Sequence, residues 1–328
     1  MSYSHLTISE RFELYRLQTT TSLSLRGIGK RMKRSQSSLS REIERNQVKD
    51  TGYLPDTAQA KAEERRGKAK PRFQEIEESC LEEIKQGLEA YHSPEQISGR
   101  IKLKGKKNLS HESIYKLIYT NHLGMGKYQQ NLRQGRVRRK ERGSVKSTRG
   151  RIPGRIGIEE RPEIANLKIE MGHWESDTVI GGNHNGVIVT HVDKASKFLL
   201  ASLAKNKTAE AVNAVTLKLF SSIESEKVKT ITSDNGKEFS QHEELSRVLG
   251  ASWYFATPYH SWERGLNEHT NGLIRQFFPK KTNFRIVKPE QLEEVVSLIN
   301  NRPRKSLGYR TPFEVFYSHI SDTDALQI

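Results

Sequence analysis

The sequence predicts a multidomain protein in which N-terminal all-helical domains precede an α/β core with a mixed five-stranded sheet flanked by helices. Three observations lead to this prediction. The chain has 328 residues, which exceeds the usual length of one domain. Short amphipathic segments with helix-capping residues dominate the first 122 residues. Runs of β-branched and apolar residues separated by turn residues begin only after residue 165.

The positive charge of the chain is concentrated in its first half. Residues 1–150 contain 32 Lys and Arg against 17 Asp and Glu, whereas residues 151–328 contain 23 against 22. A strongly basic segment binds polyanions by releasing their counterions. No apolar run approaches the ~18 residues of a membrane-spanning helix, and no signal-peptide pattern opens the chain, so we expect an intracellular protein without a membrane partner. The single cysteine, Cys80, is expected to be buried.

Residues 1–50 are predicted to form a helix-turn-helix domain. Helical periodicity covers residues 8–17, a second short helix is expected at residues 25–32, and Ser35 is a suitable N-cap for a third. The first residues of such a third helix read base edges in the major groove. The expected DNA contacts on this helix are Gln36, Ser37, Ser38 and Arg41. A helical bundle without this role is the alternative interpretation of the same pattern.

A linker is expected at residues 51–74, followed by a second helix-turn-helix-like domain at residues 75–122. Ser93 and Gln96 have the spacing of a capping box, and Ser110 is a suitable N-cap for the next helix. Between these helices lies a lysine-rich loop that phosphates would attract. Its expected DNA contacts are Lys102, Lys104, Lys106 and Lys107. A dimerising helical domain is the alternative.

Residues 123–164 are predicted to be a basic linker. Many arginines and lysines lie here among Gly, Ser and Gln with few large apolar residues, so the segment cannot bury a core. We expect it to become ordered on nucleic acid, because cations of one sign repel each other without a counter-charge. Its expected DNA contacts are Arg136, Arg138 and Arg139. A solvated linker is the alternative.

Residues 165–328 are predicted to form the α/β core. Strands beginning near His173, Gly186 and Lys197 are separated by short turns and should form an antiparallel meander. A helix, a fourth strand, a short helix, a fifth strand and a last helix complete the order βββαβαβα. This order places the first and fourth strands side by side, so that Asp177 and Asp234 can converge.

The last helix of this order is expected to begin at about Trp262. One side carries an apolar stripe that should be buried, formed by Leu266, Thr270, Leu273 and Phe277 with Ile274 on its flank. The opposite side stacks Arg264, Glu268, Asn271 and Arg275. Glu268 should then join the two aspartates in a three-carboxylate cluster of the kind that holds Mg²⁺. The alternative is an exposed glutamate that pairs with its helix neighbours.

Three motifs in the core are recognisable: H-W-E-S-D-T-V-I-G, T-S-D-N-G-K-E-F and W-E-R-G-L-N-E-H-T-N-G-L-I-R-Q-F-F-P-K. They resemble DDE transposases with a retroviral-integrase-like, RNase H-like catalytic core, and more narrowly the bacterial insertion-sequence family conventionally numbered thirty. S-Q-S-S-L-S-R-E-I-E-R-N and H-S-P-E-Q-I are similar to that family's N-terminal domains, so the resemblance covers the whole chain. It implies that Asp177, Asp234 and Glu268 are the catalytic and metal-binding acids, with two Mg²⁺ or Mn²⁺ ions per active site.

Other residues are expected around these acids. Glu175 shares a strand face with Asp177, and Asn235 follows Asp234, so both are expected to support the metal site from outside. Further expected DNA contacts are Arg264, Asn271, Arg275, Lys280 and Lys281.

The residues and the resemblance together predict a transposase of the bacterial cytoplasm and nucleoid. Its partners would be double-stranded DNA, as terminal inverted repeats and as target, and at least one further copy of the chain. The core would hydrolyse a phosphodiester and use the freed 3′-hydroxyl to attack another strand. The alternatives are a sequence-specific DNA-binding repressor with a non-catalytic, dimerising core, and a stand-alone metal-dependent nuclease. A metal-dependent cleavage and joining assay distinguishes the three.

Overall fold

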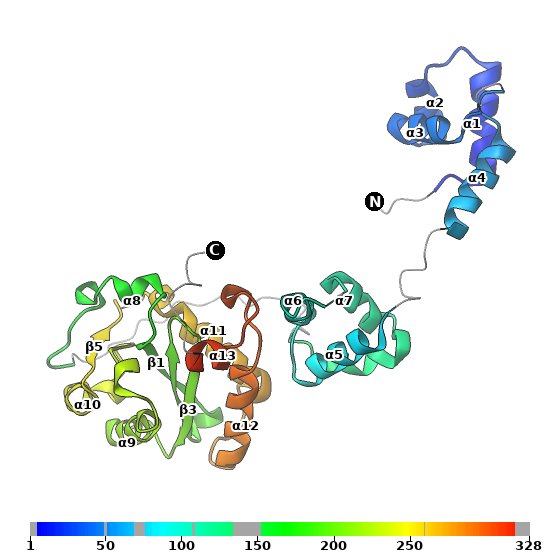
Figure 1. Cartoon of the computed structure of the whole chain (residues 1–328). Coiled ribbons are helices and arrows are strands. Elements are labelled where there is room, and N and C mark those ends of the chain that lie inside the picture. The colour runs from blue at the N-terminus through cyan, green and yellow to red at the C-terminus, as the bar shows by residue number, and fades with distance from the viewer. Residues whose placement is uncertain are drawn as a thin grey trace. The chain divides into compact units, whose positions relative to one another are not determined.

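The computed structural model describes residues 5–48, 51–68, 76–106, 109–133, 152–258 and 260–318. The chain forms two compact units, Met1–Ile76 and Glu77–Ile328, whose elements are drawn in Figure 1. Some of the expected DNA contacts lie outside the described residues, namely Lys107, Arg136, Arg138 and Arg139.

The first unit is helical. Its described helices are α1 (Ile8–Thr20), α2 (Leu25–Met32), α3 (Gln36–Asn46) and α4 (Pro55–Lys68). The first three confirm the helices expected from the sequence, and the Ser35 side chain accepts a hydrogen bond from the Ser38 N–H as the predicted N-cap. Helix α4 corrects the linker predicted at residues 51–74. It belongs to the unit because Tyr53 and Ala58 are buried in the same apolar core as α1 to α3.

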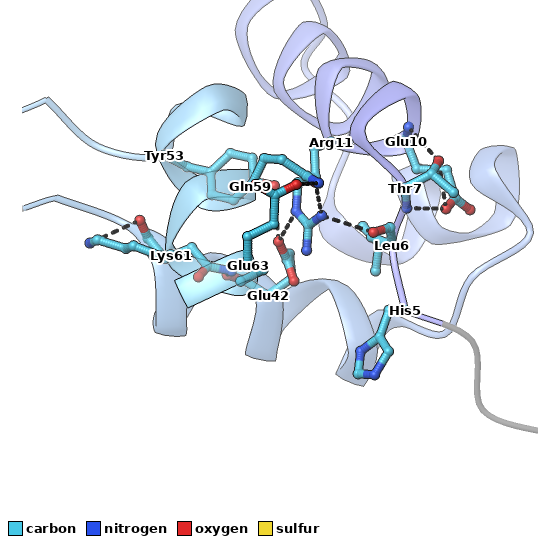
Figure 2. Close-up of polar contacts among 12 residues, drawn as sticks. His5, Leu6, Thr7, Glu10, Arg11, Glu42, Tyr53, Gln59, Lys61 and Glu63 are labelled. Carbon is cyan, nitrogen blue, oxygen red and sulfur yellow. Dashed lines mark hydrogen bonds and ion pairs between the residues drawn. The ribbon is translucent and has the colours of Figure 1, made fainter. Parts of the chain in front are cut away.

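A buried arginine joins the helices of the first unit. Arg11 on α1 is 2% exposed, and its Nε donates to Glu42 Oε1 on α3 at 2.7 Å. Its Nη1 donates to the Leu6 carbonyl and to the Gln59 side chain on α4 (Figure 2). Tyr53 donates its hydroxyl to the same Glu42 at 3.4 Å. The charge of Arg11 is therefore balanced by a carboxylate inside the unit.

The second unit begins with another helical group. It comprises α5 (Glu78–Glu89), α6 (Pro94–Leu103), α7 (His111–Tyr119) and the 3₁₀ segment η1 (His122–Asn131). Ser93 and Gln96 form the predicted capping box of α6, and Ser110 caps α7. Cys80 on α5 is buried, as expected.

A five-stranded mixed sheet follows. Its strands are β1 (His173–Ile180), β2 (Val187–Asp193), β3 (Leu199–Ala204), β4 (Thr230–Ser233) and β5 (Ser252–Phe255), in the order β3-β2-β1-β4-β5. β1, β2 and β3 pair antiparallel, whereas β4 pairs parallel with both β1 and β5. This topology confirms the predicted meander and the predicted neighbours of the first strand.

Helices cover both faces of the sheet (Figure 1). They are α8 (Ile164–Leu167), α9 (Ala209–Phe220), α10 (His242–Leu249), α11 (Gly265–Phe277), α12 (Pro289–Asn300) and α13 (Pro312–Tyr317). Side chains alternate along β2, so that Val189 joins the core with α9 and α10 while Ile188 joins the core with α11 and α12. In the described part of the chain, no helix combines the length and apolar character needed to cross a membrane.

Candidate active site

Two aspartates lie at the edge of the sheet where β1 and β4 separate. Parallel pairing sets Glu175 opposite Thr232, and continuing that register by two residues sets Asp177 opposite Asp234. β4 ends at Ser233, and the Gly236 N–H then donates to Asp234 Oδ1 at 2.9 Å. This turn fixes the Asp234 carboxylate directly after the strand, as the sequence predicts.

The guanidinium of Arg264 lies between the two aspartates. Its Nη1 is 3.7 Å from Asp177 Oδ1, and its Nη2 is 3.8 Å from Asp234 Oδ2. Nη1 also donates to the Ser176 carbonyl at 3.0 Å, and the Arg264 side chain is only 11% exposed. Arg264, predicted as a DNA contact, is therefore engaged with the sheet edge. One positive charge serves two carboxylates, so the group retains an excess of negative charge.

Asp177 is held by several donors. Asn271 on α11 donates from Nδ2 to Asp177 Oδ2 at 2.9 Å, and the Thr178 N–H donates to Oδ1 at 2.8 Å. Thr190 on β2 in turn donates to Asn271 Oδ1 at 3.3 Å. Burial raises the pKa of Asp177, while Arg264 lowers this pKa and the nearby Asp234 raises it. Asn271, another predicted DNA contact, thus orients the Asp177 carboxylate.

Glu268 does not join the two aspartates. Its side chain is exposed, and the described residues include no group of three or more His, Cys, Asp or Glu side chains arranged to hold a metal ion. The expected three-carboxylate cluster is therefore not formed in this structure. Ser261–Arg264 is a 3₁₀ turn and α11 begins only at Gly265, and the Arg264 guanidinium is the group that lies within 4 Å of both aspartates. The predicted buried stripe of α11 is confirmed, with Leu273 1% exposed.

A different carboxylate, which sequence reasoning did not identify, lies near Asp177. Glu238 is 3% exposed, accepts a hydrogen bond from the Thr178 hydroxyl at 3.1 Å and pairs with Lys207 at 2.7 Å. Its charge contributes to the raised pKa of Asp177. The signal in the sequence was its position four residues after Asp234, within the turn that follows a buried strand.

Glu175 and Asn235, the two residues expected to support the site from outside, each connect elements of the core. Glu175 is buried, accepts a hydrogen bond from the Asn267 N–H at 3.1 Å and lies 3.5 Å from Lys194. A carboxylate at the first turn of α11 stabilises the helix N-terminus. Burial lowers the pKa of Lys194 to about 8, and Glu175 opposes this shift. Asn235 donates to the Ala256 carbonyl at 2.7 Å and so joins the turn after β4 to the end of β5.

The remaining expected DNA contacts of the core differ in exposure. Arg275 donates from Nη2 to the Ile180 carbonyl at 2.6 Å and lies over the ring of Phe284, so it is used within the fold. Lys280 and Lys281, which follow α11, are exposed.

The expected DNA contacts of the helical domains also differ, because some are exposed and others are paired with a carboxylate of the protein. Gln36, Ser37 and Arg41 on α3 are exposed, and Ser38 is half-buried. Lys102, Lys104 and Lys106 are exposed, but Lys104 pairs with Glu83 on α5 at 2.9 Å, and Lys106 pairs with the same carboxylate. Both lysines lower the pKa of Glu83.

Comparison with known proteins shows the family of the chain. Residues 168–261 match the integrase core domain family, and residues 2–46 match a helix-turn-helix domain family. The transposase for insertion sequence element IS4351 from Bacteroides fragilis is 40% identical over 318 residues, which cover 97% of each chain. The chain belongs to this family of insertion-sequence transposases. The transposase InsI for insertion sequence element IS30A from Escherichia coli is 35% identical over 98% of this chain and 85% of that protein.

Family membership confirms the predicted class. The transposase combines a helix-turn-helix DNA-binding domain with an integrase core of the polynucleotidyl transferase type, and the repressor alternative is not favoured. The catalytic core domain of BIV integrase, known from a crystal structure, is 22% identical to this chain with a TM-score of 0.36. The match covers 45% of this chain and 94% of the integrase chain. Integrase cores generally use divalent metal ions.

Proposed function

We propose that this transposase cuts and joins DNA with Mg²⁺ or Mn²⁺, two ions per active site, held by Asp177, Asp234 and Glu268. The observation that carries the proposal is the position of Arg264, whose guanidinium lies within 4 Å of both aspartates. A cation is thus already accommodated between these carboxylates. Carboxylate oxygens are the ligands that Mg²⁺ takes in proteins, usually one or two per ion, which leaves positions for phosphate oxygens.

The charges around this site fit a divalent ion. Two carboxylates share the single charge of Arg264, so the site has a residual negative charge that a divalent ion would balance. Glu268 lies on α11 three residues before Asn271, which donates a hydrogen bond to Asp177. Residues three and four apart share a helix face. Glu268 is therefore the acid on α11 best placed to complete the set once Arg264 withdraws.

The residues of the chain supply alignment. When bound, the divalent ions stabilise the charge that develops on the attacking and leaving oxygens of an in-line displacement. Asn271 and the Thr178 N–H orient the Asp177 carboxylate, and the Gly236 N–H orients that of Asp234. Water attacks one phosphodiester and frees a 3′-hydroxyl, which then attacks a second strand without a covalent bond to the protein. Arg264, once released, is a cation available to the DNA backbone at the same edge.

The helical domains would select the DNA. The exposed start of α3 suits base readout of terminal inverted repeats by residues 1–50, and residues 75–122 would act as a second reader. The basic segment after η1 would join the readers to the catalytic core at residues 165–328. Two ends must be cut and joined together, so at least two copies of the chain would form the paired-end complex.

The test is a cleavage and joining assay with the full chain. Labelled duplexes carrying the ends of its own element are incubated with Mg²⁺ or with EDTA, and the cut and joined strands are mapped. We expect products only with Mg²⁺, none for Asp177→Asn, and unchanged products for Glu290→Gln, which removes an exposed carboxylate on α12. Cutting without joining would support the nuclease alternative, and cutting by Asp177→Asn would exclude this residue from the site.

A further inference from the structure

A cationic cavity of about 640 Å³ lies between the second helical group and the core. The start of α6, helix α11 and the segment after α12 contribute its walls. Its charged lining residues are Glu95, Arg133, Arg302, Arg304 and Lys305.

Two of these arginines are buried with incomplete hydrogen bonding. Arg302 is 2% exposed, and its Nη1 donates to Gln276 Oε1 at 3.1 Å, but its Nε and Nη2 have no partner among the described residues. Arg304 is 9% exposed and donates from Nη2 to the Ile299 carbonyl at 3.0 Å, while its buried Nε likewise has no partner there. Buried donors without acceptors are rare and destabilising, so an acceptor from outside would complete this site.

The charges in the cavity are also unbalanced. The lining carboxylate of Glu95 lies 2.7 Å from Lys305 and is engaged there. Burial, followed by the charge of Arg133, lowers the pKa of Arg302 to about 10. Burial, followed by the charges of Arg302 and Arg133, lowers the pKa of Arg304 to about 9. Both guanidinium groups remain charged at neutral pH. Buried cations that repel one another require a counter-charge, and an oxyanion provides one.

We propose that this cavity binds a phosphodiester group of DNA through Arg133, Arg302 and Arg304. The inference rests on the proposed function, in which DNA lies along the core. Planar guanidinium groups bind phosphate oxygens in pairs, and the N-terminus of α6, where Ser93 and Gln96 line the cavity, is a favourable end for an anion.

The position of the cavity favours DNA over a free anion. His269 lines it and directly follows Glu268 on α11, so the cavity and the proposed metal site lie along the same helical turn. A strand cut at the aspartates has further phosphates on either side, and one of them can occupy the cavity.

The test measures how salt weakens DNA binding by the full chain. Fluorescence anisotropy with an element-end duplex, without divalent metal, gives the slope of log Kobs against log salt concentration. Loss of one phosphate contact lowers the magnitude of this slope by about 1. We expect this change for Arg302→Gln and for Arg133→Gln, which alters an exposed side chain and so does not threaten folding. Arg310→Gln removes an equal charge from an exposed arginine outside the lining and should keep the wild-type slope.

A second arm separates DNA from a free anion. Thermal unfolding of the wild type and of Arg302→Gln is compared in inorganic phosphate and in chloride at equal ionic strength. Stabilisation of the wild type by phosphate with unchanged DNA slopes in the variants would overturn the DNA assignment in favour of a small-anion site. Unchanged slopes without any phosphate effect would overturn the site altogether. If the slopes of the variants are unchanged while the wild type still cuts and joins DNA, only this inference fails. If the wild type itself does not bind the element-end duplex, the proposed function fails as well.

Discussion

Both units bury arginines, but the surroundings of these arginines differ. In the first unit, the guanidinium of Arg11 contacts a carboxylate, a carbonyl and an amide oxygen of the same unit. In the second unit, Arg302 and Arg304 are buried with nitrogens that have no partner among the described residues. Arg264 is intermediate, because its single guanidinium group is paired with two carboxylates at once. Burial alone therefore does not reveal the role of an arginine; the state of its partners does.

The largest expected effect concerns the three carboxylates proposed to hold the metal ions, two of which Arg264 contacts. If all three are metal ligands, Glu268→Gln should lower the rate of end cleavage about as strongly as Asp234→Asn, by about 10³-fold or more. Glu238→Gln should retain most of the activity, because Glu238 is already paired with Lys207. The measurement is single-turnover cleavage of labelled ends in Mg²⁺. The reverse order, with Glu238 essential and Glu268 dispensable, would assign the third acid to Glu238.

The next effect compares the two kinds of buried arginine directly. Arg11→Leu leaves Glu42, whose side chain is only 13% exposed, without its cation and should destabilise the first unit by about 3–5 kcal/mol. Arg302→Leu removes one hydrogen bond to Gln276 and should cost no more than about 1.5 kcal/mol, since no carboxylate loses a partner. Hydrogen exchange in the full chain measures both losses of stability, in α1 and α3 for the Arg11 variant and in α11 and α12 for the Arg302 variant. Equal losses would mean that Arg302 is also a structural residue.

Arg264 gives an intermediate effect. Replacing it by Gln removes a cation that competes for Asp177 and Asp234, so the site should bind Mn²⁺ about 10-fold more tightly, which corresponds to about 1.4 kcal/mol. Electron paramagnetic resonance of free Mn²⁺ in titrations of the full chain measures this affinity. Arg310→Gln, at an exposed arginine, should leave the affinity unchanged. Weaker Mn²⁺ binding by Arg264→Gln would show that Arg264 supports the carboxylates rather than competing for them.

Local patterns in the sequence predicted most of the fold. Capping residues such as Ser35 and Ser93 act within three or four residues, so their helices could be located without tertiary information. The adjacency of Asp177 and Asp234 followed from strand order, because the crossover connection makes the strands that carry them parallel neighbours. Helix α4 was not predicted because its sequence is rich in charge; the burial of Ala58 and the hydrogen bond between Gln59 and Arg11 show that it packs on the first unit.

The details of the site could not be predicted in the same way. Arg264 lies in a 3₁₀ turn before α11, and helix periodicity does not locate the residue at which this turn gives way to the helix. Hydrogen bonds between residues far apart in the sequence could not be predicted either. Arg275 bonds to the carbonyl at the end of β1, which lies far from it in the sequence.

The smallest expected effect concerns the lysines of the predicted reader loop. Lys104 and Lys106 share Glu83, so part of their charge is already neutralised before DNA arrives. Glu83→Gln should release both and strengthen DNA binding about 2- to 5-fold at low salt, the range of a surface ion pair worth up to about 1 kcal/mol. Glu78→Gln provides the control, because it removes an exposed carboxylate from the same helix without touching these lysines. Fluorescence anisotropy at two salt concentrations measures the DNA affinity of both variants. An equal gain for both variants would reflect net charge alone, and the loop would then not contact the DNA backbone.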